Sequence, residues 1–395
     1  MANPTTTSRA TIHSAAKRRR LSDDHHHSLL PGLPDHVAHL CLSLISPTAM
    51  FSVCRSWRRL IYSSYFPPFP SLYTLSLPTT TAAGRHNQTL KLSSFDPISS
   101  KWITIDSPPV PPSLHRHPSF ISRNLPIQSL SVSGNLLLLA ATSGHLLPAF
   151  SHPLIFNPLT DTWSSGPPLS TPRRWCAAGA LQGTVVVASG IGSHYTQTVA
   201  RSVEKWVFFK AESFDKKRKD SDWNNWEKMR SLRNVKLCRE AIDAVGWKRK
   251  LCMVNVKGDY AKEGFVYAMD SDEWVEMPEG MLGGWRGPAA AMDEETLYVV
   301  DESKGVLKRY DENGDQWSEV MADERLKGAE YIAAGGGRVC VLCEKDVGIL
   351  VVDVVATPPR LWVLETPAGD RILAVHILPR MCLPEFRSAV GSESK

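Results

Sequence analysis

The sequence lacks the features that mark membrane-spanning, secreted and zinc-binding proteins. No segment reaches 18 consecutive apolar residues, and no apolar core follows the basic residues near the start. We therefore expect neither a membrane-spanning helix nor a secretory signal peptide. The eight cysteines follow no framework spacing, which favours a reducing compartment over a disulfide scaffold. The Cys-x-x-Cys at 340–343 lies in a β-branched run without a second pair, so we expect no metal site.

Net charge is absent from most of the chain. Residues 1–68 hold eight lysines and arginines against three aspartates, so they carry the whole formal charge of +5 and residues 69–395 sum to zero. A nucleic-acid-binding domain usually has a basic face. The neutrality of residues 69–395 therefore argues against nucleic acid as their partner.

The two ends of the chain and one internal stretch are polar. Residues 1–28 are rich in Thr and Ser and end in a His run, so we expect a disordered tail, and likewise for residues 385–395. The cluster Lys17–Arg20 is either a nuclear localisation signal or a solvated basic patch. The charged insertion at 210–225 is expected to be a loop.

Residues 29–68 have the apolar spacing of helices. Pro34 suits the start of a first helix, and Ser46-Pro47 ends it and starts another. Apolar residues recur at helical spacing before and after that break: Val37, Leu40, Cys41, Leu44, Ile45, Val53, Trp57, Leu60 and Ile61. Three short helices cannot bury much core alone, so this module needs something to pack on.

From about residue 71 the pattern changes to short strands and turns. A turn rich in Asp, Asn, Pro, Gly and Ser precedes a tryptophan six times, at Trp102, Trp163, Trp226, Trp274, Trp317 and Trp362. A period near 50 residues with several strands per unit predicts a β-propeller of six blades. The final strand-like run, 371–378, has no partners, and the first unit lacks an inner strand. We therefore expect the C-terminal strand to complete the first blade and remove an open edge.

Two stretches resemble known families. "LPDHVAHLCLSLIS" followed by "VCRSWRRLI" resembles an F-box, and the tryptophan units resemble degenerate kelch repeats. The chain is thus similar, over roughly residues 29–384, to plant F-box/kelch-repeat proteins of the Skp-interacting type. This implies a mainly β fold, with a small three-helix F-box at 29–68 before a six-bladed kelch-type propeller at 69–384. The stretch between Pro47 and Val53 is about one helical turn shorter than a usual F-box, and the kelch double glycine is mostly absent.

The resemblance implies a role. F-box proteins are substrate receptors of SCF-type cullin–RING ubiquitin ligases, so the implied partners are the Skp adaptor, cullin and RING subunits through it, and an unknown target protein. Nucleic acid, membrane and cofactor are not implied, and the location would be nucleus, cytoplasm or both. By position in the motif, the adaptor-facing or F-box-core set is Leu33, Pro34, Val37, Leu40, Leu44, Val53 and Trp57.

Two other functions stay open. The protein could be a scaffold or nuclear regulatory protein that uses the helical segment for another partner. Propellers also host enzymes. However, the turn at 310–317 departs from the sialidase repeat, and the sequence has no catalytic triad order, nucleophile elbow or phosphate loop. We therefore expect no catalytic activity.

A basic residue precedes several small-residue strands, which favours a target site on the propeller axis. If the blades are equivalent, these residues form a ring at one mouth of the channel that could bind carboxylates or phosphates. The alternative is that they pair with neighbouring acids and that the adjacent tryptophans pack between blades. The candidate target-binding residues are Arg174, Trp175, Arg239, Trp285, Arg286, Lys327 and Arg371.

Overall fold

The computed structural model describes residues 29–63, 65–67, 69–78, 90–106, 108, 128–139, 149–208, 225–232, 241–257, 260–344, 348–367 and 369–380. Its contacts divide the chain into two compact units, Met1–Ile61 and Tyr62–Lys395. The predicted tails at 1–28 and 385–395 lie outside the described residues, as do Lys17–Arg20 and most of the 210–225 insertion.

The first unit contains three short helices, α1 (Asp35–Ser43), α2 (Pro47–Val53) and α3 (Arg55–Ile61). Pro34 is the N-cap residue of α1, one position before the helix itself, whereas Pro47 is the first residue of α2. Ala38 and Leu42 lie four residues apart on one face of α1, and both are fully buried. The stretch between Pro47 and Val53, which is shorter than in a usual F-box, still forms helix α2, and Met50 of this helix is buried.

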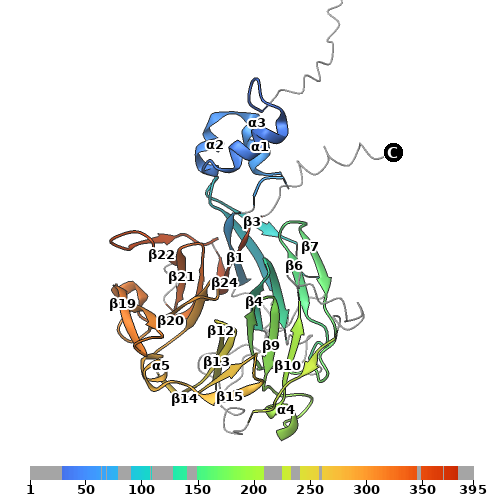
Figure 1. The fold of residues 1–395 in the computed structure, drawn as a ribbon, viewed down its shortest axis with the longest axis vertical. Helices are drawn as coiled ribbons and strands as arrows, with labels where there is room; N and C mark the ends of the chain where they lie inside the picture. Colours follow the sequence, from blue (N-terminus) through green and yellow to red (C-terminus); the bar gives the residue numbers. More distant parts are fainter. Residues whose placement is uncertain are drawn as a thin grey trace, which may run out of the picture. The chain divides into compact units, whose positions relative to one another are not determined.

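The second unit is a six-bladed β-propeller, as the tryptophan period predicted (Figure 1). Each described sheet has four antiparallel strands, and the inner strands of adjacent blades contact one another. From the innermost strand outward, the first three blades are β24 (Asp370–Pro379), β1 (Pro70–Pro78), β2 (Lys91–Asp96), β3 (Lys101–Ile105); β4 (Gln128–Val132), β5 (Asn135–Leu139), β6 (Leu154–Asn157), β7 (Thr162–Ser165); and β8 (Ala177–Leu181), β9 (Thr184–Ala188), β10 (Val203–Val207), β11 (Glu227–Lys228).

The other three blades follow the same order. They are β12 (Ala241–Trp247), β13 (Lys250–Lys257), β14 (Tyr260–Ala268), β15 (Glu273–Glu276); β16 (Ala289–Met292), β17 (Thr296–Asp301), β18 (Val306–Asp311), β19 (Gln316–Ala322); and β20 (Ala329–Gly335), β21 (Arg338–Cys343), β22 (Ile349–Asp353), β23 (Arg360–Leu364). Short helices α4 (Gln197–Arg201), α5 (Glu279–Gly284) and η3 (Glu324–Leu326) lie in the connections between strands.

The last strand closes the ring, and the prediction for residues 371–378 is confirmed. Strand β24 pairs antiparallel with β1, from Pro70 opposite Pro379 to Pro78 opposite Asp370. The Tyr73 hydroxyl also donates a hydrogen bond to the Pro379 backbone oxygen at 2.8 Å. The first blade therefore combines strands from both ends of the propeller sequence, and no inner edge is left open there.

The repeat tryptophans link neighbouring blades. Five of the six donate their indole N–H to a backbone oxygen of the preceding blade or its connection, at 2.8–2.9 Å. All five also pack against an aromatic residue on the adjacent strand, as Trp317 does against Tyr310 with ring centroids 5.2 Å apart. Trp362 differs, since it lies opposite Val351 and is 42% exposed.

Small residues on the inner strands permit close approach of the backbones. A Cβ added to Gly246 of β12 would lie 1.8 Å from the backbone oxygen of Ala180 in β8. The second strands are mostly apolar, and every residue of β9 is buried. The core therefore lies between adjacent blades, and small residues make up much of the lining on the axis.

The segment after α3 is held against the first blade. The Tyr62 hydroxyl donates to Asp96 at 2.8 Å, and the Arg380 guanidinium lies 3.9 Å from the centre of the Tyr62 ring. The backbone N–H of Arg380 donates a hydrogen bond to the backbone oxygen of Phe69. These contacts tie the segment after α3 to the propeller unit, which begins at Tyr62.

Candidate functional site

The helical unit exposes large apolar side chains. Leu40 of α1 and Leu44, the C-cap residue of that helix, lie four residues apart on one face and are 67% and 88% exposed. Ala38 and Leu42 occupy the buried face of the same helix. We call the full set the apolar surface: Leu33, Leu40, Leu44, Ile45 and Val53. Exposed clusters of large apolar residues commonly mark protein interaction sites.

Trp57 has a structural role within this unit. It is half-buried, and its indole N–H donates to the backbone oxygen of Leu29 at 2.9 Å, which ties the start of the described chain to α3. Positive charge lies nearby along α3. The Arg58 guanidinium lies 4.7 Å from the centre of the Phe51 ring and donates to the Phe51 backbone oxygen.

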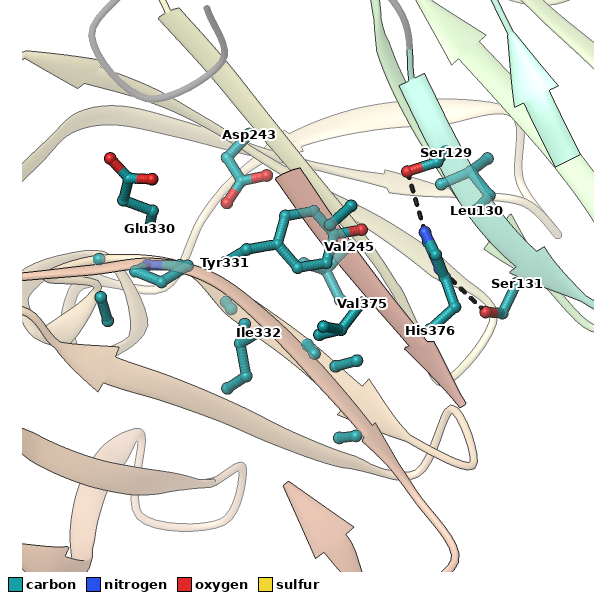
Figure 2. A pocket seen from close by; sticks show the side chains of 18 of the residues that line it. Ser129, Leu130, Ser131, Asp243, Val245, Glu330, Tyr331, Ile332, Val375 and His376 are labelled. Atoms are coloured by element: carbon teal, nitrogen blue, oxygen red, sulfur yellow. Dashed lines mark hydrogen bonds between the residues drawn. The ribbon is translucent and has the colours of Figure 1, made fainter. Parts of the chain in front are cut away.

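The propeller encloses a cavity of about 950 Å³ on its axis, lined by residues of the inner strands (Figure 2). Its size is within the range of small-molecule and peptide sites. Tyr331 of β20 and His376 of β24 lie in its wall with ring centroids 6.0 Å apart. The wall on β8 and β12, across the axis, carries small groups, including Gly179 and Ala244.

His376 connects two blades inside the cavity. Its Nε2 lies 2.9 Å from the Ser129 hydroxyl and its Nδ1 lies 3.2 Å from that of Ser131, both on β4. Burial lowers the pKa of His376 to about 3, so the imidazole is neutral at physiological pH. A neutral ring held between two hydroxyls fixes the first blade against the second and adds no charge to the cavity.

One end of the cavity is acidic. At the end where β20 and β24 begin, the lining residues with charged side chains are Asp243, Glu302, Glu330, Glu344 and Arg371, which we call the acidic mouth. Backbone hydrogen bonds from Gly328 to Glu302 and from Glu344 to Gly328 bring two of these acids together from different blades. In Figure 2 the carboxylates of Asp243 and Glu330 lie together at the end away from His376.

At the opposite end Glu294 lines the cavity, and its carboxylate is already engaged in a hydrogen bond. Both of its carboxylate oxygens accept from the Gln182 backbone N–H, at 2.8 and 2.6 Å. Burial raises the pKa of Glu294. This hydrogen bond joins the turn after β8 to the turn after β16, so Glu294 serves to connect blades.

The comparisons with known proteins place the chain in a family. No family profile matches it. The chain is, however, 49% identical over 368 residues to the F-box/kelch-repeat protein SKIP25 of Arabidopsis thaliana, and the match covers 91% of each chain. The chain belongs to the F-box/kelch-repeat family. More distant relatives from the same plant are F-box protein AFR, 24% identical over 69% of this chain and 68% of that one, and F-box/kelch-repeat protein SKIP4, 23% identical over 83% and 85%.

The family assignment identifies the helical unit as the F-box and the six blades as kelch-type repeats. Of the seven residues predicted to face the adaptor or form the F-box core, Leu33, Pro34, Leu40, Leu44 and Val53 are exposed. Val37 and Trp57 are half-buried. The sequence did not separate the adaptor-facing residues from the F-box core; Val53 is 58% exposed, and the predicted set did not include the exposed Ile45.

The structure does not assemble the predicted basic ring. Arg174 is 8% exposed, its guanidinium donates to the Gly192 backbone oxygen, and it lies 4.7 Å from the centre of the half-buried Trp175 ring. Trp285 is 1% exposed and packs edge-on against Trp317, so it is not an exposed anchor. The blades are therefore not equivalent at these positions, because Arg174 before β8 is buried whereas Arg286, at the same distance before β16, is exposed.

Three of the remaining basic candidates, Arg286, Lys327 and Arg371, are exposed but differ in where their charge lies. Arg286 donates to the Gly283 backbone oxygen, and Lys327 pairs with Glu324 at 2.7 Å. Arg371 alone among the described candidates both carries a charge and lines the cavity, with its guanidinium 3.9 Å from Glu330. Arg239 lies outside the described residues. The acids of the mouth were not predicted, because they come from separate connections and show no common spacing.

The described residues hold neither a helix that could span a membrane nor a group of three or more His, Cys, Asp or Glu arranged to hold a metal ion. Cys340 is buried between the sixth and first blades, and burial raises the pKa of its thiol to about 12. Cys343 is half-buried in the same strand.

Proposed function

We propose that this protein is the substrate-recognition subunit of an SCF-type ubiquitin ligase. The F-box binds the Skp adaptor and the propeller binds a target protein for ubiquitination. The adaptor connects the protein to the cullin and RING subunits, which supply the catalytic machinery. The protein itself acts by bringing the target close, in the nucleus, the cytoplasm or both.

The apolar surface of the F-box supports this proposal most strongly. Burying an exposed leucine side chain contributes roughly 2 kcal/mol, so Leu40 and Leu44 together could supply a large part of a stable interface. Their place on one face of a helix suits packing against helices of a partner. A helical unit this small gains little from its own core, so exposed leucines here are better explained by a partner than by folding.

The test is co-purification of the full-length protein with the Skp adaptor. We expect Leu40→Glu with Leu44→Glu to abolish the complex, because two charges would be buried at the interface. Val355→Glu is the matched control: Val355 is 72% exposed on the sixth blade, and its substitution should leave adaptor binding intact.

Two results would overturn the proposal. One is failure of the intact, folded protein to bind the adaptor, which would favour a scaffold or nuclear regulatory role through another partner. The other is full adaptor binding by the double leucine variant. Circular dichroism of each variant separates loss of binding from loss of folding.

A further inference from the structure

The tryptophan of the sixth blade does not occupy the position of the other repeat tryptophans. In the fifth blade, Trp317 lies directly after the residue pair that closes the turn between β18 and β19, opposite Tyr310. In the sixth blade Leu361 stands at this position, opposite Val352, and Trp362 comes one residue later. Because successive side chains of a strand point to opposite faces, this shift turns Trp362 to the other face of its sheet.

The shift leaves Trp362 at the surface of the molecule. Leu361 packs in the core between the fifth and sixth blades, on the face where the other repeat tryptophans lie. Trp362 lies opposite Val351 on the face whose inner residues pack against the first blade. Exposure rises outward along this row, from 3% at Cys340 and 7% at Val351 to 42% at Trp362. The core contact is thus made by Leu361, and much of the indole is left to solvent.

A longer turn adds a second exposed apolar side chain. The connection 354–359 between β22 and β23 has six residues, whereas 312–315 in the fifth blade has four. Val355 of this turn is 72% exposed and lies against Gly337, where an added Cβ would be 2.7 Å from its Cγ2. Arg338 follows Gly337, and its guanidinium lies 5.9 Å from the centre of the Trp362 ring, within range of a cation–π interaction. Val355, Arg338 and Trp362 therefore belong to one surface.

This surface carries a positive charge that the described residues do not neutralise. Arg338, Asp353 and Arg360 lie opposite one another across β21, β22 and β23, so their side chains share the face of Trp362. The Asp353 carboxylate pairs with Arg338 at 2.9 Å and accepts from two backbone N–H groups of the turn, both at 3.1 Å. Arg360 is exposed, and its side chain has no hydrogen bond or ion pair with the described residues. Its charge is therefore available to a partner.

We propose that the rim surface, which consists of Arg338, Val355, Arg360 and Trp362, binds a short acidic segment of the target protein that carries an apolar side chain next to its carboxylates. This inference rests on the proposed function and gives the place and the chemistry of target binding. The guanidinium of Arg360 pairs with an Asp or Glu of the segment, which it can hold by two parallel hydrogen bonds. Trp362 and Val355 cover the apolar side chain.

The composition of the rim surface selects this kind of partner. Tryptophan and arginine are enriched among the residues that dominate binding energy at protein interfaces. A purely apolar segment would bury the charge of Arg360 without a partner, which is costly, and a basic segment would be repelled. A contact between two rim surfaces related by two-fold symmetry would bring like charges together, which argues against a second copy of the chain as the occupant. An acidic segment with an apolar side chain satisfies both kinds of group.

The inference is tested with a short fluorescein-labelled peptide of Gly and Ser that carries a central Glu-Leu-Glu. One comparison peptide carries lysine in place of each glutamate, and another carries serine in place of the leucine. Fluorescence anisotropy with the full-length protein should show saturable binding of the Glu-Leu-Glu peptide, weaker binding of the serine peptide and no binding of the lysine peptide. Arg360→Glu should weaken binding of the first peptide about tenfold, corresponding to roughly 1.4 kcal/mol, and Trp362→Ala should weaken it by a similar factor.

Two matched controls lie on other blades. Arg309→Glu makes the same charge reversal at an exposed arginine of β18, and Val275→Ala shortens a 50% exposed apolar side chain of β15. Both should leave the dissociation constant unchanged. Equal loss of binding in either control, unchanged binding in Arg360→Glu, or equal binding of the lysine peptide would overturn the proposal. So would no binding of the Glu-Leu-Glu peptide even at low ionic strength, where such attraction is strongest.

Two competing occupants come from this chain itself. The C-terminal residues 381–395 include Glu385 followed by Phe386, so they carry the same chemistry as the proposed segment. Deleting them should leave peptide binding unchanged, and a tenfold gain would overturn a target segment as the occupant. Analytical ultracentrifugation should give the same mass for the wild type and for Trp362→Ala. A dimer that dissociates in this variant would identify a second copy as the occupant and would also overturn the proposal.

The adaptor assay distinguishes failure of this inference from failure of the proposed function. Arg360→Glu and Trp362→Ala should each retain adaptor binding, and the Leu40→Glu and Leu44→Glu variant should retain peptide binding. Absence of peptide binding in a protein that binds the adaptor would overturn the role of the rim surface alone. Absence of adaptor binding in a protein that binds the peptide would overturn the ligase role, and the rim surface would then not be the site of a ubiquitination target.

Discussion

The indole N–H of Trp102 donates a hydrogen bond to the backbone oxygen of Glu365, 263 residues later, at 2.8 Å. Trp102 belongs to the outermost strand of the first blade, and Glu365 follows the outermost strand of the last. The ring is therefore joined at its outer rim by a repeat tryptophan, as well as on the axis by β24.

Replacing Trp102 by phenylalanine tests this outer junction. The substitution keeps an aromatic ring beside Phe95 and removes the donor, so we expect a loss of about 1 kcal/mol in the free energy of unfolding. The control is Trp362→Phe, at the 42% exposed repeat tryptophan, which should cost less. Urea denaturation measures both. Equal losses would show that the bond to Glu365 adds nothing to the junction.

The buried His376 predicts acid sensitivity. Its pKa is lowered to about 3 in the folded protein, whereas an unfolded histidine titrates near 6.5. Between these values the unfolded state binds the extra proton, so stability is fully present above about pH 6.5 and falls as the pH drops toward 3. The expected loss is at most about 1.4 kcal/mol per pH unit.

His376→Gln isolates this effect, since glutamine can bond to Ser129 and Ser131 but cannot be protonated. We expect the wild type to lose about 2 kcal/mol more than this variant between pH 7 and pH 5, measured by urea denaturation at each pH. Parallel pH profiles would show that His376 is not held neutral in the folded protein.

Because Arg173 and Glu204 form a buried ion pair in the third blade, we expect the effects of substituting them on the free energy of unfolding to be strongly coupled. Both side chains are essentially inaccessible, and the Glu204 carboxylate also accepts from the Ser170 N–H at 3.1 Å. Glu204→Leu leaves an unpaired buried guanidinium, so we expect a loss of about 3–5 kcal/mol. Adding Arg173→Leu should recover much of this loss.

The half-exposed pair of Lys205 and Glu227, at 3.4 Å in the same blade, provides the control. Glu227→Leu should change stability by less than about 1 kcal/mol. If the double variant at Arg173 and Glu204 were no more stable than Glu204→Leu alone, the pair would not be coupled as the structure indicates. Denaturation with urea gives the comparison.

The fold was predictable because its signals are local. Each repeat tryptophan follows a turn within a few residues, so the number of repeats predicted the number of blades. The six are Trp102, Trp163, Trp226, Trp274, Trp317 and Trp362. The closing strand was predictable for a similar reason, since residues 371–378 had no partner of their own. Local patterns repeat in each blade and survive large changes in loop length.

The propeller site was predicted less well because its geometry is not local. The spacing of Arg174 and Trp285 relative to the inner strands gave no indication that both side chains are buried. Glu302, Glu330 and Glu344 come from a turn, a strand and a strand end, and they meet only when the blades close around the axis. On the F-box, helical spacing grouped the apolar residues but did not show which face stays exposed.

The pairing of β24 with β1 also has a consequence for protein synthesis. The hydrogen bond between Tyr73 and Pro379 cannot form until Pro379 has been translated, 306 residues after Tyr73. At ordinary rates of synthesis this takes roughly 15–60 s, during which the inner edge of β1 has no native partner. A nascent propeller thus exposes that edge to chaperones or to aggregation until translation is nearly complete, and a stop codon just before Asp370 would leave it exposed permanently.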